Sequence, residues 1–250
     1  MITEWLAGLE LISAIVLVSA SFLGSLLTAA VGVGGGAFLI TIMADIVPPL
    51  ALIPVHGIVQ LGSNTSRAVL TRKHTQWSSV GWFLLGGLVA TVLSIWLLTN
   101  IQLSFIPLII AIFILWICWG PMPEVGLANT RLGLSVGGLL TTAASMLVGA
   151  SGPLVSAWLG RKSGDRWAYT ANFSTCMALQ HSLKIVVFGI AGFAFAEWLL
   201  LLAFMIIAGY VGTNVGLKLL GKIPERQFKT LFRWILTLLS IRLILLWWLS

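Results

Sequence analysis

The chain has 250 residues, of which 59% are hydrophobic and only 8% are charged, and its mean hydropathy is +1.06. This composition excludes an ordinary water-soluble surface, because soluble domains carry charge at about a quarter of their positions. A net charge of +7 could suggest nucleic acid, but the basic residues cluster in short loops between apolar segments. The positive-inside rule describes that distribution for membrane proteins. We therefore expect a membrane-embedded chain with no nucleic-acid partner.

Apolar segments recur at nearly the length of a membrane-spanning helix, which is about 20 residues. They cover residues 11–31, 49–71, 78–99, 103–120, 131–149, 167–193, 195–217 and 230–249. The ten-residue apolar and polar alternation of an outer-membrane barrel is absent from the sequence. The pattern predicts an all-α, polytopic helical membrane protein in contact with the lipid bilayer.

Two short motifs suggest that the chain contains an internal repeat. The residues VGVGGG at 31–36 align with VGASGP at 148–153, and the same offset places Arg67 on Lys184. A chance match between apolar segments is the alternative. We expect one transmembrane domain made of two repeats, residues 1–122 and 123–250, joined through the loop at 121–131.

The loop charges bear on how the halves are oriented. If residues 11–46 and 131–160 each fold back at their glycines as a helical hairpin, ten cations share one side of the membrane. These cations are Arg72, Lys73, Arg131, Arg161, Lys162, Arg166, Lys218, Lys222, Arg226 and Lys229. Single broken spans are the alternative, but they place these cations on both sides. The hairpin arrangement predicts inverted halves with both termini periplasmic.

Glycines interrupt one apolar segment in each half. Each glycine weakens a helix by up to about 1 kcal/mol, and broken helices in membranes are tolerated where they line a cavity. A helix that starts at such a break presents unpaired N–H groups and a positive dipole end, which favour an anion. Close helix packing is the alternative role for glycine. The candidate binding positions are Gly34, Gly35 and Gly36 in the first half, and Ser151 and Gly152 in the second.

Each half also carries polar residues one helical turn apart within an apolar segment, which places them on one face of a helix. The first set is His56, Gln60, Asn64 and Arg67, and the second is Asn172, Cys176, Gln180, His181 and Lys184. The histidines suit either hydrogen-bonded packing or proton transfer.

Arg67 and Lys184 have no acidic partner within the apolar segments, because all seven acids lie near segment ends or in loops. A charge inside a span costs at least about 2.5–3.5 kcal/mol, so it is usually paired, hydrated or functional. A bound anion would neutralise both cations, whereas snorkelling to the interface is the alternative. No metal-ligand spacing and no recognisable catalytic motif is present, so we expect neither cofactor nor metal nor enzymatic activity.

The chain resembles the TauE/SafE sulfite exporter family. The resemblance rests on VGVGGGAFLIT, VPPLALIPVHGIVQLGSNTSRAVLTRKHTQW, GASGPLVSAWLGRK and ALQHSLKIVVFG, and it covers essentially the whole chain. It implies a bacterial inner-membrane permease for sulfite or small organosulfur anions, often an exporter, with duplicated halves. The family glycine motif maps onto Gly32, Gly34, Gly35 and Gly36, and its second copy onto Gly149, Ser151, Gly152 and Pro153. The second copy has fewer glycines, so the two halves need not hold the ligand equally.

We therefore expect a secondary transporter that exports sulfite or a related small organosulfur anion across the bacterial inner membrane. Its ligand would lie near the bundle centre, among residues of both halves. The alternative is a non-transporting membrane assembly or scaffold protein whose polar stripes serve helix packing. The sequence does not indicate an oligomeric state.

Overall fold

The computed structural model describes residues 6–32, 34–98, 105–121, 130–159, 165–220, 222 and 225–249. All regular structure within these residues is helical, which confirms the all-α prediction. The first elements are α2 (Leu11–Val31), α3 (Gly35–Met43), α4 (Pro49–Thr71), η1 (Arg72–His74), α5 (Trp77–Leu98) and α6 (Ile106–Trp119). The later elements are α7 (Arg131–Val148), α8 (Gly152–Leu159), α9 (Arg166–Ile190), η3 (Phe195–Trp198), α10 (Leu199–Lys218) and α11 (Glu225–Leu249). The predicted boundary between the halves, at residues 122 and 123, lies outside the described residues.

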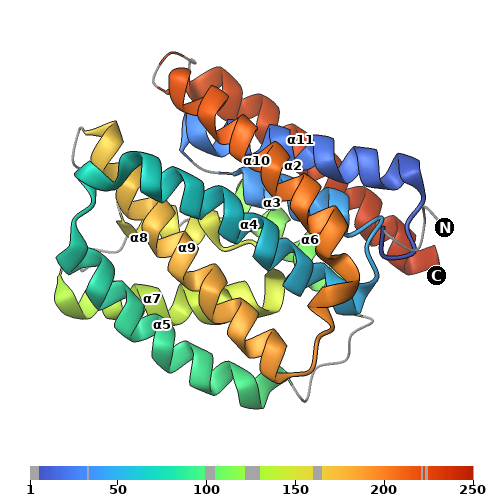
Figure 1. The fold of residues 1–250 in the computed structure, drawn as a ribbon, viewed down its shortest axis with the longest axis horizontal. Coiled ribbons are helices and arrows are strands. Elements are labelled where there is room, and N and C mark those ends of the chain that lie inside the picture. The colour runs from blue at the N-terminus through green and yellow to red at the C-terminus, as the bar shows by residue number, and fades with distance from the viewer. Residues whose placement is uncertain are drawn as a thin grey trace.

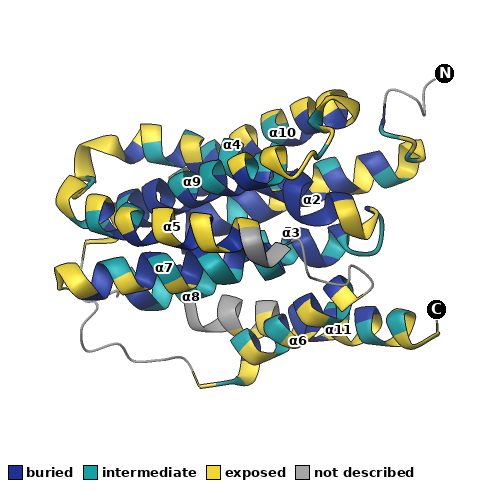
Figure 2. Ribbon diagram, turned by 90° about the horizontal axis from the view of Figure 1, so that it is seen from below, coloured by how far each residue is buried: buried dark blue, intermediate teal, exposed yellow. Residues whose placement is uncertain are grey.

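Five of the described helical segments are long and apolar enough to cross a membrane: Leu11–Val31, Trp77–Ile95, Arg131–Val148, Arg166–Ile190 and Phe195–Lys218. Large apolar side chains are exposed on the outer helices, among them Ile12 at 73%, Val92 at 70% and Ile207 at 61%. Figure 2 shows exposed positions along the outward faces of α5, α10 and α11, with the buried positions turned inward. In water such a surface would be unfavourable, whereas lipid solvates it. The chain is therefore a multi-pass membrane protein.

The first predicted hairpin is present, because the chain reverses at the glycines between α2 and α3. Gly32 and Gly34 have φ values of +99° and +111°, which only glycine adopts readily. After the reversal α3 packs against α2 so closely that a Cβ on Gly35 would lie 1.7 Å from the Gly24 carbonyl oxygen. Figure 1 shows α3 running back beside α2.

The second predicted hairpin is present as well. The chain reverses after Gly149, whose φ is +74°, and α8 folds back onto α7. The indole Nε1 of Trp158 donates a hydrogen bond to the carbonyl of Gly133, 25 residues earlier. A Cβ on Gly137 would lie 2.2 Å from the same indole, so the missing side chain makes room for the Trp158 ring. Each half thus contributes one long helix and one short helix that begins inside the bundle.

The helices of the two halves are interleaved. Helices α4 and α9 pack against each other at the centre, α2 packs against α10, α5 against α7, and α6 against α11 (Figure 1). Glycines allow close backbone contact at two of these interfaces, α2 with α10 and α5 with α7. A Cβ on Gly212 would lie 2.2 Å from the Phe22 carbonyl oxygen, and one on Gly138 would lie 1.9 Å from that of Phe83. Such close approach is typical of helix packing in membranes, where dispersion contacts replace the hydrophobic driving force.

The start of α2 and the end of α11 lie at the same end of the molecule in Figure 1, on the right. The C-terminal ends of α4 and α10 and the N-terminal ends of α7 and α9 lie at the opposite end. Those helix ends carry Arg72, Lys73, Arg131, Arg166 and Lys218. The hairpin arrangement predicts such a separation, while the inversion of the halves and the side of the membrane that each end faces stay predictions. Arg161 and Lys162, which were expected on the same side, lie outside the described residues.

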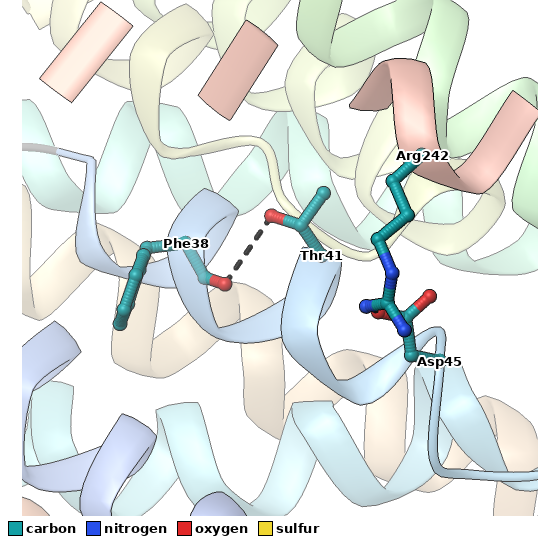
Figure 3. Close-up of polar contacts among 4 residues, drawn as sticks. All are labelled: Phe38, Thr41, Asp45 and Arg242. Carbon is teal, nitrogen blue, oxygen red and sulfur yellow. Dashed lines mark hydrogen bonds and ion pairs between the residues drawn. The ribbon is translucent and has the colours of Figure 1, made fainter. Parts of the chain in front are cut away.

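An ion pair joins the C-terminal helix to the short helix α3. The guanidinium of Arg242 on α11 contacts the carboxylate of Asp45, which lies in the turn after α3 (Figure 3). The Asp45 side chain is 9% exposed and the Arg242 side chain is 59% exposed, so the carboxylate is the more deeply buried partner. Within α3, the Thr41 hydroxyl donates to the carbonyl of Phe38 at 3.2 Å (Figure 3).

Candidate anion-binding site

A small cavity lies where the two hairpins face each other across α4 and α9. It is lined by residues of both halves: Thr28, Gly34, Gly36, Ala37, His56, Gln60, Asn64, Ala150, Gly152, Pro153, Phe173, Met177 and His181. Its volume is about 10 Å³, which is room for about one water molecule. The starts of α3 and α8 both reach it, so the two short helices converge on one point.

The structure brings six of the eleven expected site residues to this cavity. They are Gly34, Gly36, Gln60, Asn64, Gly152 and His181. The other five lie behind the cavity wall: Gly35, Arg67, Ser151, Gln180 and Lys184. Their contacts show what each does there.

On the α3 side, the cavity is lined by the backbone at the start of α3 and by the side-chain amide of Gln60. Gly36 is in the first turn of α3, where backbone N–H groups have no partner within the helix. The Gln60 amide lies beside Gly36, with room for an ordinary van der Waals contact between them. A Cβ there would lie 3.4 Å from Gln60 Cδ and 3.5 Å from its Nε2. Gly35 has another function, since its N–H donates to the Thr28 hydroxyl at 3.0 Å and ties α3 to α2.

The α8 side is fixed by a buried hydrogen-bond network rather than by glycines. The Ser151 hydroxyl, at the break before α8, donates to the side-chain oxygen of Gln180. The Gln180 amide nitrogen in turn donates to the hydroxyls of Thr141 and Thr142, at 3.1 and 3.0 Å. Gln180 and Ser151 therefore position the start of α8 against α7 and α9. Gly152, the first residue of α8, lines the cavity itself.

Two histidines, one from each half, face each other at the cavity. The rings of His56 and His181 are T-shaped with centroids 6.0 Å apart, and both residues are fully buried. His56 Nε2 lies 3.0 Å from the Gly36 carbonyl oxygen, and because a carbonyl only accepts, this nitrogen is the donor. Neither nitrogen of His181 has a hydrogen-bond partner among the described residues. An unpaired polar group inside a membrane is costly, so His181 has free capacity for a ligand.

Arg67 and Lys184 are buried rather than snorkelling, at 1% and 0% exposure. Arg67 donates to the side chains of Asn64 and Ser63, both at 3.2 Å. Lys184 Nζ donates to the carbonyl of Gly149, at the turn before α8, at 2.8 Å. In the part of the chain that the structure describes, neither has a carboxylate partner. Neither residue lines the cavity, but each bonds to a residue next to or in its lining, Arg67 to Asn64 and Lys184 to Gly149. In a medium of low dielectric constant, two such cations without a carboxylate partner among the described residues make the cavity attractive to an anion.

Several lining residues were not identified from the sequence. Phe173 and Met177 precede His181 at spacings of eight and four and so share its helix face, but they are apolar and therefore do not belong to a stripe defined by polar residues. His56 was recognised as part of the first stripe but was not counted among the candidate site residues. Pro153 belongs to the second copy of the family motif but is not among the candidate binding positions, and Thr28, Ala37 and Ala150 carry no pattern beyond adjacency to the glycine breaks.

Comparison with known families supports a specific assignment. The family model for the sulfite exporter TauE/SafE matches residues 17–243, which is nearly the whole chain. The chain belongs to the TauE/SafE family. No curated protein and no solved structure matches it. As a TauE/SafE member with several membrane-crossing helices, it is a membrane transport protein, and the glycine turns of both hairpins lie within the matched region.

Proposed function

We propose that this chain is a secondary transporter that exports sulfite or a related small organosulfur anion across the bacterial inner membrane. Its ligand site is the cavity between α3, α4, α8 and α9, with Arg67 and Lys184 supplying positive charge from behind the wall. The observation that carries the proposal is the convergence of two helix starts and the unpartnered His181 on one buried point. None of the residues lining that point is acidic.

A pyramidal or tetrahedral oxyanion suits these groups better than a linear or planar anion. Its oxygens point in different directions and each accepts hydrogen bonds, so they can meet donors from several elements at once. The cavity offers the backbone at Gly36, the Gln60 amide and the His181 ring from separate directions. Helix N-termini add a positive dipole end on each side. Chemistry of this kind accommodates sulfite, thiosulfate and small sulfonates alike.

The cavity volume supports a site that changes shape during transport. About 10 Å³ accommodates a water molecule but not a four-atom anion. Binding therefore requires the short helices α3 and α8 to separate. We propose that the halves are inverted repeats and that rocking of one against the other opens the cavity alternately to the two sides.

The function is tested by flux of sulfite, thiosulfate and methanesulfonate in proteoliposomes containing purified protein. The proposal predicts saturable flux of at least one of these anions, abolished by Arg67→Ala and by Lys184→Ala. Lys218→Ala is the matched control, because Lys218 is an exposed cation on α10 far along the chain from the cavity residues. Absence of flux for all three anions, or flux that survives both cavity substitutions, would contradict the proposal.

A further inference from the structure

A second hollow lies away from the cavity, at the basic end of the molecule. It is lined by Val69, Leu70, Arg72, Lys73, His74 and Trp167 and has a volume of about 350 Å³. We call it the basic hollow. Its walls come from the end of α4, from η1 and from the start of α9, at the left end of Figure 1. It therefore lies between α4 and α9, the two central helices that also carry cavity residues.

The basic hollow is held in shape by contacts between the two halves. The rings of His74 and Trp167 are stacked, with centroids 5.8 Å apart and planes inclined by 26°. Close by, the backbone N–H of Gln76 donates to the side-chain oxygen of Asn172 at 2.7 Å, and the Asn172 amide donates back to the Gln76 side chain at 3.3 Å. These contacts fix η1 and the start of α5 onto α9. The hollow is therefore a built feature and not a chance gap between long side chains.

The chemistry of the lining is amphipathic. Arg72, Lys73 and His74 are exposed and bring cationic and hydrogen-bonding groups to one part of the hollow. Val69 and Leu70 are 51% and 47% exposed, and they continue the lipid-facing surface of α4. None of the lining residues that the structure describes is acidic. The neighbouring Asp165 caps the start of α9, since its carboxylate accepts from the backbone N–H of Trp167 at 2.8 Å, and it is not one of the described lining residues.

We infer that the basic hollow binds an anionic phospholipid. The phosphate lies against Arg72 and Lys73, the headgroup lies beside Trp167, and an acyl chain follows Val69 and Leu70. Basic pockets between helices at the cytoplasmic face suit such headgroups, and Trp favours the interface. A soluble phosphate would use the cations but would leave the adjoining apolar wall without a partner. The lipid would bridge α4 and α9 at the end of the molecule where the basic residues gather.

The test is native mass spectrometry of the purified full chain titrated with dioleoylphosphatidylglycerol or dioleoylphosphatidylcholine. We expect tighter binding of the phosphatidylglycerol. A cation near an anionic lipid contributes about a fivefold gain in affinity, so the double variant Arg72→Gln, Lys73→Gln should bind it about 25-fold more weakly. The control pair Lys218→Gln, Lys222→Gln removes the same charge from exposed positions outside the hollow and should change the affinity less than about twofold. Lys73→Gln alone, expected to weaken binding about fivefold, keeps the test available if the double variant folds poorly.

Three results would overturn the inference: equal affinity for the two lipids, equal weakening in the two double variants, or displacement of the lipid by inorganic phosphate. The last would assign the hollow to a soluble anion. Because this readout measures lipid binding and not flux, it is independent of whether the cavity transports sulfite.

Discussion

The neighbouring glycines Gly35 and Gly36 allow a paired test, because the structure gives them different tasks. In Gly35→Ala the new methyl group would lie 1.7 Å from the Gly24 carbonyl oxygen and 2.4 Å from the Thr28 hydroxyl. Neither the backbone of α2 nor a hydroxyl that bonds α3 can move aside without separating the two helices. Overpacking costs about 1–3 kcal/mol and a lost hydrogen bond about 1 kcal/mol more. We expect destabilisation of about 3 kcal/mol.

Gly36→Ala should behave in the opposite way. Its methyl group would lie 3.4 Å from Gln60 Cδ, an ordinary contact, and alanine favours helix by up to about 1 kcal/mol over glycine. Stability should therefore be unchanged or higher. The methyl group does, however, occupy a cavity of about 10 Å³ and cover the Gln60 amide. A hydrogen bond to a charged group contributes about 1.5–3 kcal/mol, so anion affinity should fall about ten- to hundredfold.

Both substitutions can be read by denaturant titration in detergent followed by Trp fluorescence, with anion flux measured on the same preparations. The expected pattern is unstable protein for Gly35→Ala, and stable protein with impaired flux for Gly36→Ala. If Gly35→Ala is as stable as the native chain, the packing of α3 on α2 is misassigned. If Gly36→Ala transports normally, the cavity is not the anion site.

Further predictions follow from three other groups. Lys184→Met should abolish flux while raising stability, because it removes a buried charge that costs at least about 2.5–3.5 kcal/mol in a membrane; lower stability would contradict this. His181→Ala should weaken anion binding without removing a hydrogen bond within the described part of the protein, and binding titrations would show the weaker affinity. Arg242→Ala should destabilise more than Asp45→Asn, because it leaves the more buried partner, a carboxylate, uncompensated. Desolvation, partly opposed by Arg242, raises the pKa of Asp45 above 3.8. The folded chain then binds the Asp45 carboxyl proton more tightly than the unfolded chain does. The contribution of Asp45 to the free energy of unfolding should therefore fall as pH rises through the folded pKa, and Asp45→Asn should remove that pH dependence.

Much of the fold could be predicted from sequence because the lipid environment restricts the options. A chain this apolar must satisfy its backbone within helices, and α4 spans the expected residues 49–71. The reversals at the glycines could also be predicted, because uninterrupted helices would be too long for the bilayer and would scatter the basic loops over both sides. What periodicity could not supply is the partner of each helix. The pairings of α2 with α10 and of α5 with α7 depend on glycine contacts between distant segments.

The candidate site could also be predicted in part, because the spacing of polar residues shows which of them share one face of a helix. Spacing along a helix placed Gln60, Asn64 and His181 on inward faces, and these residues do line the cavity. Spacing does not tell how far a long side chain reaches. Lys184 ends on the Gly149 carbonyl, and Arg67 ends on its own helix neighbours, one turn behind the wall. Their proposed role is therefore electrostatic rather than direct contact with the anion.

The most direct test of the central claim is to locate a bound anion. Selenite has the shape and charge of sulfite and contains an anomalous scatterer, so diffraction from crystals grown with it gives the anion position independently of its oxygens. We expect one strong anomalous peak between the starts of α3 and α8, placed so that the selenite oxygens lie within hydrogen-bonding distance of His181 and Gln60, in a cavity larger than 10 Å³. A cavity that stays closed and empty while selenite binds elsewhere on the protein would contradict it.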